Sequence, residues 1–331
     1  MARSPSRTCP AAGLALALTM AAALGGCSRG AASDGANAGA RPTLRVASQK
    51  GSTKSLMVAS HALDGAPYRV EWSEFPSAQT LLEALGAQAV DLGGAGDAPF
   101  LFAYANNPKL KVVQIYRSAG GGRSVAVVVR DASPIKTVAD LKGRKIATGK
   151  GSIGHYLILR LLEQAHLKPS DVRLIFLSPG DSKAALASGA VDAWSTWGSF
   201  IGLETLHDHG RVVVDGRGLL NSYGFYASND AAIRDKRPQL EDFLRRLASA
   251  ERWELTHPDA RAIVLAKETG MPQDVARDTV DKLRPQPIEI TPNVVAEERA
   301  TLKRYADAGV IPKAPPTDGA FDTSFNATVH P

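Results

Sequence analysis

The chain has 331 residues, of which 44% are hydrophobic and 22% are charged, with a formal net charge of +6 at pH 7. This composition is typical of a globular protein that is long enough for two lobes or domains. The basic residues form no dense run, which argues against a nucleic-acid partner. The two cysteines are Cys9 and Cys27. The sequence after Cys27 therefore offers no disulfide, no thiolate metal site and no cysteine nucleophile.

The first 26 residues have the pattern of a secretory signal peptide. Arg3 and Arg7 precede an apolar stretch at residues 11–24, which is too short for a stop-transfer helix. The sequence Leu-Gly-Gly-Cys, ending at Cys27, resembles the lipobox of bacterial lipoproteins. That resemblance implies that residues 1–26 are removed and that Cys27 carries a lipid. The alternative is a plain signal peptide followed by an incidental cysteine.

After a predicted disordered tether at residues 27–42, strands and helices alternate as in an α/β protein. The predicted strands lie at residues 44–47, 68–72, 89–92, 112–116, 124–129, 145–148, 172–177, 190–194 and 211–215. Helices are predicted at residues 53–63, 77–85, 133–143, 181–186, 239–253, 258–269, 272–283 and 292–308, and within residues 149–165. The segment 221–226 is expected to cross back from the second half of the molecule to the first.

The stretch 149–165 combines a glycine-rich turn with the start of an amphipathic helix. Its glycines let the backbone approach a bound group closely, and Ser152 can cap the helix. The free N–H groups of the first turn favour an anion, and His155 and Tyr156 are near enough to add side-chain contacts. We interpret the stretch as half of a binding site for a small anion. The alternative is an ordinary strand-to-helix turn whose glycines allow tight packing.

A second polar turn follows the first predicted strand, at residues 48–53. Gln49 and Ser52 can hydrogen-bond a ligand from this turn. Lys50 is either a salt partner for an anion or an ordinary surface charge.

One supersecondary unit occurs twice, at residues 77–92 and 181–194. Each copy is predicted to be a helix, a glycine turn and then Val-Asp entering a short buried strand, which suggests two lobes of similar build. After the first copy, Pro99 fits the first position of a helix with Asp97 or Ala98 at its N-cap. Asp97 can cap this helix, contact a ligand, or do both.

The second copy leads into two tryptophans that are three residues apart, Trp194 and Trp197. Aromatic rings at the exit of a strand can line a cleft, or they can pack in the core. Tyr223, in the crossing segment, lies either near the cleft or buried at the crossing.

Five motifs occur in an order that resembles the aliphatic sulfonate-binding proteins of ABC transporters. These proteins belong to the nitrate/sulfonate/taurine group of periplasmic solute-binding proteins, and the likeness covers residues 43–230. The motifs lie at residues 49–52, 96–99, 150–156, 177–179 and 190–197.

The resemblance implies an α/β protein with the type II periplasmic-binding-protein fold, in which two lobes enclose a ligand cleft. Lobe one would comprise residues 43–122 plus 223–331, and lobe two residues 123–222. Family members commonly have an aromatic residue in place of Ser48 and an aspartate in place of Gly198, so the identity of the anion stays open. The ligand-binding residues that the motifs suggest are Gln49, Asp97 and Ala98 from lobe one, with Ser152, His155, Trp194 and Trp197 from lobe two.

The function implied is a monomeric, periplasmic component of an ABC importer, attached to a bacterial membrane through Cys27. Its expected partners are a small organic anion, a permease and the ATPase subunits, with no cofactor, metal or catalytic residue. A sulfonate is permanently ionised and has three acceptor oxygens, which suits backbone N–H groups at helix starts. The alternatives are another small anion (taurine, nitrate, a sulfate ester or an aromatic sulfonate), a receptor module that feeds a sensor, or an enzyme on the same fold.

Overall fold

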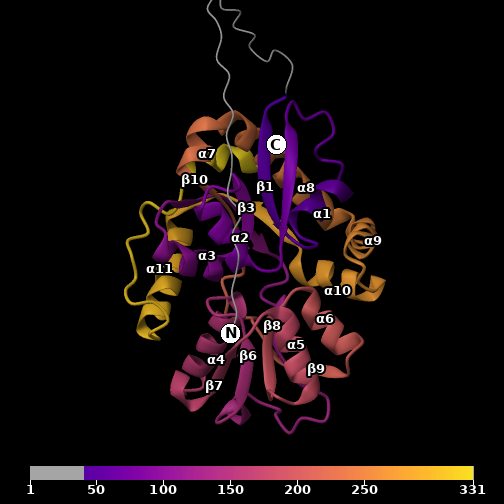
Figure 1. Cartoon of the computed structure of the whole chain (residues 1–331), viewed down its shortest axis with the longest axis vertical. Coiled ribbons are helices and arrows are strands. Elements are labelled where there is room, and N and C mark those ends of the chain that lie inside the picture. Colours follow the sequence, from indigo (N-terminus) through magenta and orange to yellow (C-terminus); the bar gives the residue numbers. More distant parts are fainter. Residues whose placement is uncertain (1–40, 331) are drawn as a thin grey trace, which may run out of the picture. The chain divides into compact units, whose positions relative to one another are not determined.

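Eleven strands form two separate sheets within residues 41–330, the part of the chain that this computed structural model describes (Figure 1). The first sheet contains β1 (Thr43–Gln49), β2 (Arg69–Phe75), β3 (Leu92–Gly96), β4 (Leu110–Ser118), β10 (Tyr223–Asn229) and β11 (Pro285–Ile288). The second contains β5 (Val125–Arg130), β6 (Lys145–Thr148), β7 (Arg173–Phe176), β8 (Ala193–Trp197) and β9 (Gly210–Asp215).

Both sheets are mixed. The first has the strand order β11-β4-β10-β3-β1-β2, and its strands β10 and β11 run against the other four. The second has the order β7-β6-β8-β5-β9, and β5 runs against its neighbours β8 and β9. Because β10 is inserted between β3 and β4, the chain returns from the second sheet into the middle of the first.

Helices pack against each sheet, and we call each sheet with its helices a lobe. The first lobe has α1 (Thr53–Ala59), α2 (Ala78–Gly86), α3 (Asp97–Asn106), α7 (Asp230–Asp235), α8 (Arg237–Thr256), α9 (Pro258–Thr269), α10 (Gln273–Leu283) and α11 (Pro292–Asp307). The second lobe has α4 (Ile153–Gln164), α5 (Pro179–Ser188) and α6 (Ser199–Leu206). Short 3₁₀ turns lie at Ala139–Leu141, Pro169–Asp171 and Thr323–Val329.

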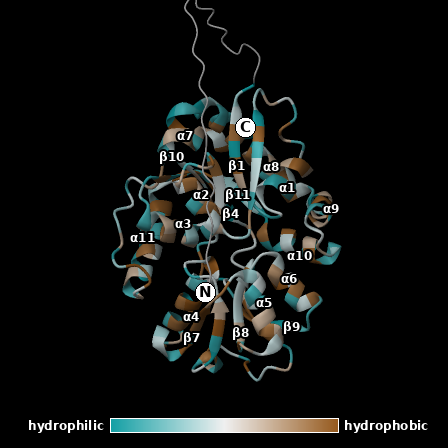
Figure 2. Ribbon diagram, viewed as in Figure 1, coloured by the Kyte–Doolittle hydropathy of each residue, from teal (hydrophilic) through white to brown (hydrophobic). Residues whose placement is uncertain are grey.

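The apolar pattern of the sequence accounts for these elements. In β5 every residue from Val125 to Val129 is buried, as expected for a strand that is covered on both faces. In α4, Leu157, Leu161 and Leu162 face the core of the second lobe, and this helix is largely hydrophobic in Figure 2.

The two Val-Asp strands were predicted three residues too early. The strands begin at Leu92 and Ala193, after the aspartates rather than with them. The Asp91 carboxylate accepts the N–H of Arg45 at 2.7 Å, and the Asp192 carboxylate accepts that of Lys145 at 2.8 Å. Each aspartate thus ties the residue before its own strand to the neighbouring strand, and the repeated unit is present in both lobes.

Two predicted helices also differ from the structure. The segment 133–143 contains only the short turn Ala139–Leu141, because the Asp140 side chain accepts the N–H groups of Lys136 and Thr137 at 3.0 and 2.9 Å. Helix α3 begins at Asp97, two residues before the expected Pro99. A proline fits there as well, since the first turn of a helix needs no N–H.

The strands of the first sheet fall within residues 43–118 and 223–288, and those of the second within 125–215. The predicted lobe boundaries at 122 and 222 stay predictions. The signal peptide, Cys27 and nearly all of the tether lie outside the described residues. Within residues 41–330, no helix combines the length and apolar character needed to cross a membrane.

Candidate functional site

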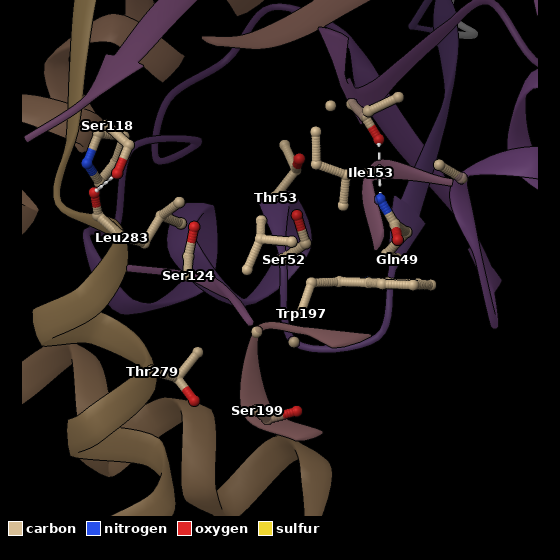
Figure 3. A pocket seen from close by; sticks show the side chains of 18 of the residues that line it. Gln49, Ser52, Thr53, Ser118, Ser124, Ile153, Trp197, Ser199, Thr279 and Leu283 are labelled. Carbon is tan, nitrogen blue, oxygen red and sulfur yellow. Dashed lines mark hydrogen bonds between the residues drawn. The ribbon is translucent and has the colours of Figure 1, made fainter. Parts of the chain in front are cut away.

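A cavity of about 570 Å³ lies between the two lobes. Both lobes contribute to its wall, with residues from the ends of β1, β3 and β8 and from the starts of α1, α3, α4 and α6. Figure 3 shows side chains of this wall, with Gln49 and Ile153 at one side and Ser118 and Leu283 at the other. The volume suits a small organic molecule held between two surfaces.

Residues whose backbone N–H groups are unpaired within residues 41–330 line this cavity from both lobes. Within residues 41–330, the amides of Thr53, Ile153 and Ser199 have no hydrogen-bond partner, and all three residues line the cavity. They stand in the first turns of α1, α4 and α6. Unpaired N–H groups at helix starts carry partial positive charge, so this part of the cavity favours an anion.

The turn between β1 and α1 lines the cavity as the sequence predicts. Gln49 ends the strand instead of belonging to the turn, and its Nε2 donates to the carbonyl of Gly94 at 3.3 Å. Ser52 is the N-cap of α1, but its hydroxyl makes no capping hydrogen bond and is exposed toward the cavity. Lys50 is exposed beside it.

At the start of α4 the predicted cap is confirmed, since the Ser152 hydroxyl accepts the N–H of His155 at 3.1 Å. His155 itself does not line the cavity. Its Nδ1 accepts the N–H of Gly151 at 3.1 Å, and its ring packs against Phe176. Burial lowers the pKa of His155 to about 4, so the imidazole is neutral and supports the glycine turn from behind.

Asp97 lines the cavity at the start of α3, although its side chain is only 2% exposed. Its carboxylate accepts the N–H of Ala98 at 2.6 Å. Burial raises the pKa of Asp97 to about 7, against the lowering effect of the N–H groups of Ala98 and Tyr223. Ala98 is fully buried and does not line the cavity, and its amide is already used by Asp97.

The two tryptophans lie on opposite faces of β8, because residues three apart on a strand point in opposite directions. Trp197 lines the cavity, whereas Trp194 is 1% exposed and packs in the core beside Phe200. Tyr223 lines the cavity too, but its hydroxyl is directed to Glu297, to which it donates at 2.8 Å.

The structure therefore brings together seven of the ten residues that the sequence suggested as ligand contacts, and places three elsewhere. The three outside the cavity wall are Ala98, His155 and Trp194. The direct binding of a ligand by any of the ten stays a prediction. The seven in the wall are Gln49, Lys50, Ser52, Asp97, Ser152, Trp197 and Tyr223.

The C-terminal helices contribute more to the cavity than the sequence indicated. No ligand-binding residue was predicted in these helices, yet Glu254 of α8 and Arg261 of α9 both line the cavity and are 4% exposed. Tyr116 of β4 and Tyr226 of β10 stand in the same wall. No local pattern marks these four residues, because they meet only through the packing of α8 and α9 on the first sheet.

Two α/β lobes around one cavity, with helix starts directed into it, define the architecture of periplasmic binding proteins. The predicted type II fold class is confirmed by solved structures. One is the alkanesulfonate-binding protein SsuA from Xanthomonas axonopodis pv. citri bound to MOPS, with a TM-score of 0.80 and 30% identity, covering 86% of this chain and 99% of that one. Another is the periplasmic aliphatic sulphonate binding protein SsuA from Escherichia coli, with a TM-score of 0.74 and 31% identity, covering 82% and 94%.

The chain belongs to the NMT1/THI5-like family, whose model matches residues 70–261. A relative from Escherichia coli (strain K12), whose name describes an aliphatic sulfonates-binding protein, is 33% identical over 274 residues, or 82% of this chain and 85% of the relative. The resemblance found in the sequence motifs is thereby confirmed. In the described part of the chain, no group of three or more His, Cys, Asp or Glu side chains is arranged to hold a metal ion.

Proposed function

We propose that this protein is the solute-binding component of an ABC importer and that it captures a small organic sulfonate in the interlobe cavity. The observation that carries the proposal is that Thr53, Ile153 and Ser199, whose amides have no partner within residues 41–330, line one cavity from both lobes. A sulfonate does not lose its charge at physiological pH, so partial positive charges and neutral donors suffice to hold it. The names of the relatives support the same ligand class.

The hydrogen-bond donors in the cavity wall suit the binding of a sulfonate better than they suit catalysis. Ser152 and the free amides can donate to the sulfonate oxygens, while Trp197 and Phe200 cover an organic tail. Neither His155 nor Asp97 is placed as an acid–base pair, since His155 supports a turn outside the cavity. The protein binds its solute and releases it unchanged.

Closure of the lobes would trap the ligand and produce the form that a permease recognises. Contacts between the lobes flank the cavity on two sides. On one side Tyr156 of α4 donates its hydroxyl hydrogen to Thr301 of α11 at 3.2 Å. On the other, His207 at the end of α6 lies 3.0 Å from Asp274 of α10.

A thermal-shift titration tests the ligand class. Butanesulfonate, taurine, a sulfate ester and nitrate are added in increasing concentration to the purified protein, and a true ligand raises the melting temperature with its concentration. We expect a sulfonate to give the largest shift, with the ligand recovered unchanged after incubation. A shift with nitrate alone would assign the site to another anion, and turnover of a bound compound would make the protein an enzyme.

The lipid anchor at Cys27 and the periplasmic location belong to the same proposal. Expression of the full chain with Cys27→Ser should move the protein from the membrane fraction to the soluble fraction. Cys9→Ser is the matched control, since Cys9 lies within the predicted signal peptide. Equal membrane association of both variants would argue against the anchor.

A further inference from the structure

Two buried carboxylates, Asp97 and Glu298, lie next to each other in the first lobe. Asp97 begins α3 and lines the cavity. Glu298 belongs to α11, which packs against α3, and it is fully buried outside the cavity wall. We call these two residues the carboxylate pair.

Within residues 41–330, every hydrogen bond to the carboxylate pair comes from a neutral group. Asp97 accepts the N–H of Ala98 at 2.6 Å and also that of Tyr223. The Oε1 atom of Glu298 accepts a hydrogen bond from Asn221 Nδ2 at 2.9 Å, and its Oε2 atom has no partner in the described chain. Burial of a carboxylate without a cation strongly favours its protonated form.

The two carboxylates interact, and their surroundings determine which one keeps a proton. Burial raises the pKa of Glu298 well above its ordinary value, and the charge of Asp97 raises it further. Burial raises the pKa of Asp97 only to about 7, because backbone N–H groups stabilise its ionised form. In the free protein at pH 8, Glu298 is therefore protonated and Asp97 carries a negative charge.

The side chains that face Asp97 from β4, β10 and α11 do not neutralise it. The charge of Asp97 adds to burial in raising the pKa values of Tyr116 and Tyr305, so both phenols stay neutral. Burial also raises the pKa of Tyr223, to about 12. The guanidinium of Arg117 lies over the Tyr223 ring, 4.9 Å from its centroid, and is hydrogen-bonded to the Tyr223 hydroxyl.

The charged residues of α11 and α2 leave the carboxylate pair without a cation as well. Glu297 adds a negative charge that raises the pKa of Glu298. Arg304 is paired with Glu163 of α4 at 3.3 Å. Glu83 is the one charged residue of α2, and it is exposed.

Tyr305 connects the carboxylate pair to the anion-binding turn at the start of α4. Its hydroxyl donates to the carbonyls of Gly151 and Ser152 at 3.5 and 3.4 Å, and the charges of Asp97 and Glu298 both raise its pKa. The α4 side of this contact is uncharged, since burial lowers the pKa of His155 to about 4. An ionised Asp97 is thus close enough to disfavour an anion at this turn.

The charge of the cavity wall depends on Asp97. Its other charged residues are Lys50, Glu254 and Arg261, and the charges of the last two cancel in their ion pair. With Asp97 ionised, the charge of Lys50 is cancelled too. With Asp97 protonated, the charge of Lys50 remains to complement an anionic ligand.

We propose that the protein takes up one proton together with its sulfonate, and that Asp97 receives this proton while Glu298 keeps the one it already holds. This inference rests on the proposed function and adds a regulation of the same site by pH. The proton comes from the solvent and forms an O–H bond on the Asp97 carboxylate. Since the coupling is reciprocal, a bound sulfonate favours protonation of Asp97, and protonation of Asp97 favours the sulfonate.

Calorimetric titration with butanesulfonate at pH 8 counts the protons. It is run in Tris and in bicine, which are not sulfonates and differ in their heats of ionisation. We expect the apparent binding enthalpies to differ by the amount that corresponds to uptake of about one proton, because free Asp97 is mostly ionised at this pH. Equal enthalpies, or release of a proton, would overturn the proposal and leave the proposed function intact. Absence of binding at pH 6, where free Asp97 is mostly protonated, would remove the proposed function first.

The affinity should follow the same titration. Between pH 6 and pH 8 we expect binding of butanesulfonate to weaken by about tenfold, since the ligand itself does not titrate in this range. An affinity that stays constant from pH 6 to pH 8 would contradict proton uptake.

Three variants identify the group that takes up the proton. Asp97→Asn should bind butanesulfonate at pH 8 about tenfold more tightly than the parent and take up no proton, because its amide cannot ionise. Glu298→Gln should keep the uptake, since it replaces a carboxyl group that is already protonated, and it tests the assignment even if Asp97→Asn does not fold. Glu251→Gln is the matched control, because Glu251 is fully buried and has a pKa of about 8 but lies outside the cavity wall. Undiminished uptake in Asp97→Asn, or its loss in either of the other variants, would overturn the assignment to Asp97.

Discussion

The guanidinium of Arg261 lies 3.3 Å from the carboxylate of Glu254, and the two side chains are only 5% and 4% exposed. The pair joins α8 to α9, and the further hydrogen bond from Arg261 to the Gly51 carbonyl joins both helices to the turn that carries Ser52. Burial of an ion pair costs desolvation energy, so the pair contributes mainly by positioning the segments that it joins. Here it holds the turn after β1 against the cavity.

Removal of the Arg261 guanidinium should destabilise the folded protein. Arg261→Met leaves Glu254 buried without a partner, and we expect the free energy of unfolding to fall by about 3–5 kcal/mol. Urea denaturation measures this loss. Lys303→Met is the control, because Lys303 pairs with Asp307 at an exposed position on α11 and should lose less than about 1 kcal/mol. Equal stability of the two variants would show that the Arg261–Glu254 pair contributes nothing.

We expect Ser152 both to cap α4 and to bind the ligand. Its hydroxyl caps α4, as the Ser178 hydroxyl caps α5 by accepting the N–H of Asp181 at 3.2 Å. Ser152→Ala and Ser178→Ala should each lower the free energy of unfolding by about 1 kcal/mol. Only Ser152→Ala should also weaken the binding of butanesulfonate, by about fivefold, because only Ser152 lines the cavity. Equal affinities in a calorimetric titration would exclude Ser152 as a ligand contact.

The buried Glu251 makes stability depend on pH. Burial raises its pKa to about 8 from an ordinary value of 4.5, although the hydrogen bond from Tyr226 acts in the opposite direction. Between these values the folded protein keeps a proton that the unfolded chain releases, so this group makes the folded state less stable as the pH rises from about 4.5 to 8.

Glu251→Gln removes this titration. The free energy of unfolding of the variant, relative to the parent, should therefore rise by about 1.4 kcal/mol per pH unit between pH 5 and 8 and level off above that range. Asp97 and Glu204, whose pKa values burial raises to about 7, are present in both proteins and cancel in the comparison. Urea denaturation at several pH values measures the difference. A constant difference across this range would mean that Glu251 is ionised in the folded protein at neutral pH.

Local patterns predicted much of the fold, and the failures have physical causes. The strand Lys145–Thr148 and the helix Pro258–Thr269 have the predicted bounds, because apolar periodicity, a cap or a proline sets each of them within its own segment. The strands at Leu92 and Ala193 were placed too early because the preceding aspartates bond to a neighbouring strand, which no local pattern reveals.

In the candidate site, too, residues marked by a local pattern could be predicted, and residues brought together only by packing could not. Residues at the end of a strand or in the turn that follows it, such as Gln49 and Ser152, could be predicted because a connection between a strand and a helix leads to the edge of a sheet. The pair Glu254–Arg261 could not, because its place depends on how α8 and α9 pack against the first lobe. The sequence could not tell which of Trp194 and Trp197 lines the cavity. The structure distinguishes them, because they lie on opposite faces of β8.

The interface of α6 with α10 should control closure of the lobes. A Cβ atom added to Gly202 of α6 would lie 3.0 Å from Asp278 Oδ2 and 3.2 Å from Val275 Cγ1 of α10. A bulky side chain at this position would hold the lobes apart without entering the cavity, which Gly202 does not line. We expect Gly202→Trp to weaken binding of the sulfonate at least about tenfold by disfavouring the closed form, and to increase the radius of gyration in solution scattering with ligand present.

Gly180→Trp is the matched control, because Gly180 lies in α5 of the same lobe with no neighbouring atom within 4 Å of its added Cβ. The control should bind the sulfonate like the parent and reach the same closed dimensions. If Gly202→Trp also behaves like the parent in both measurements, approach of α6 to α10 is not required for ligand capture. Closure would then have to take place about the other contact between the lobes, where α4 meets α11 through Tyr156 and Thr301.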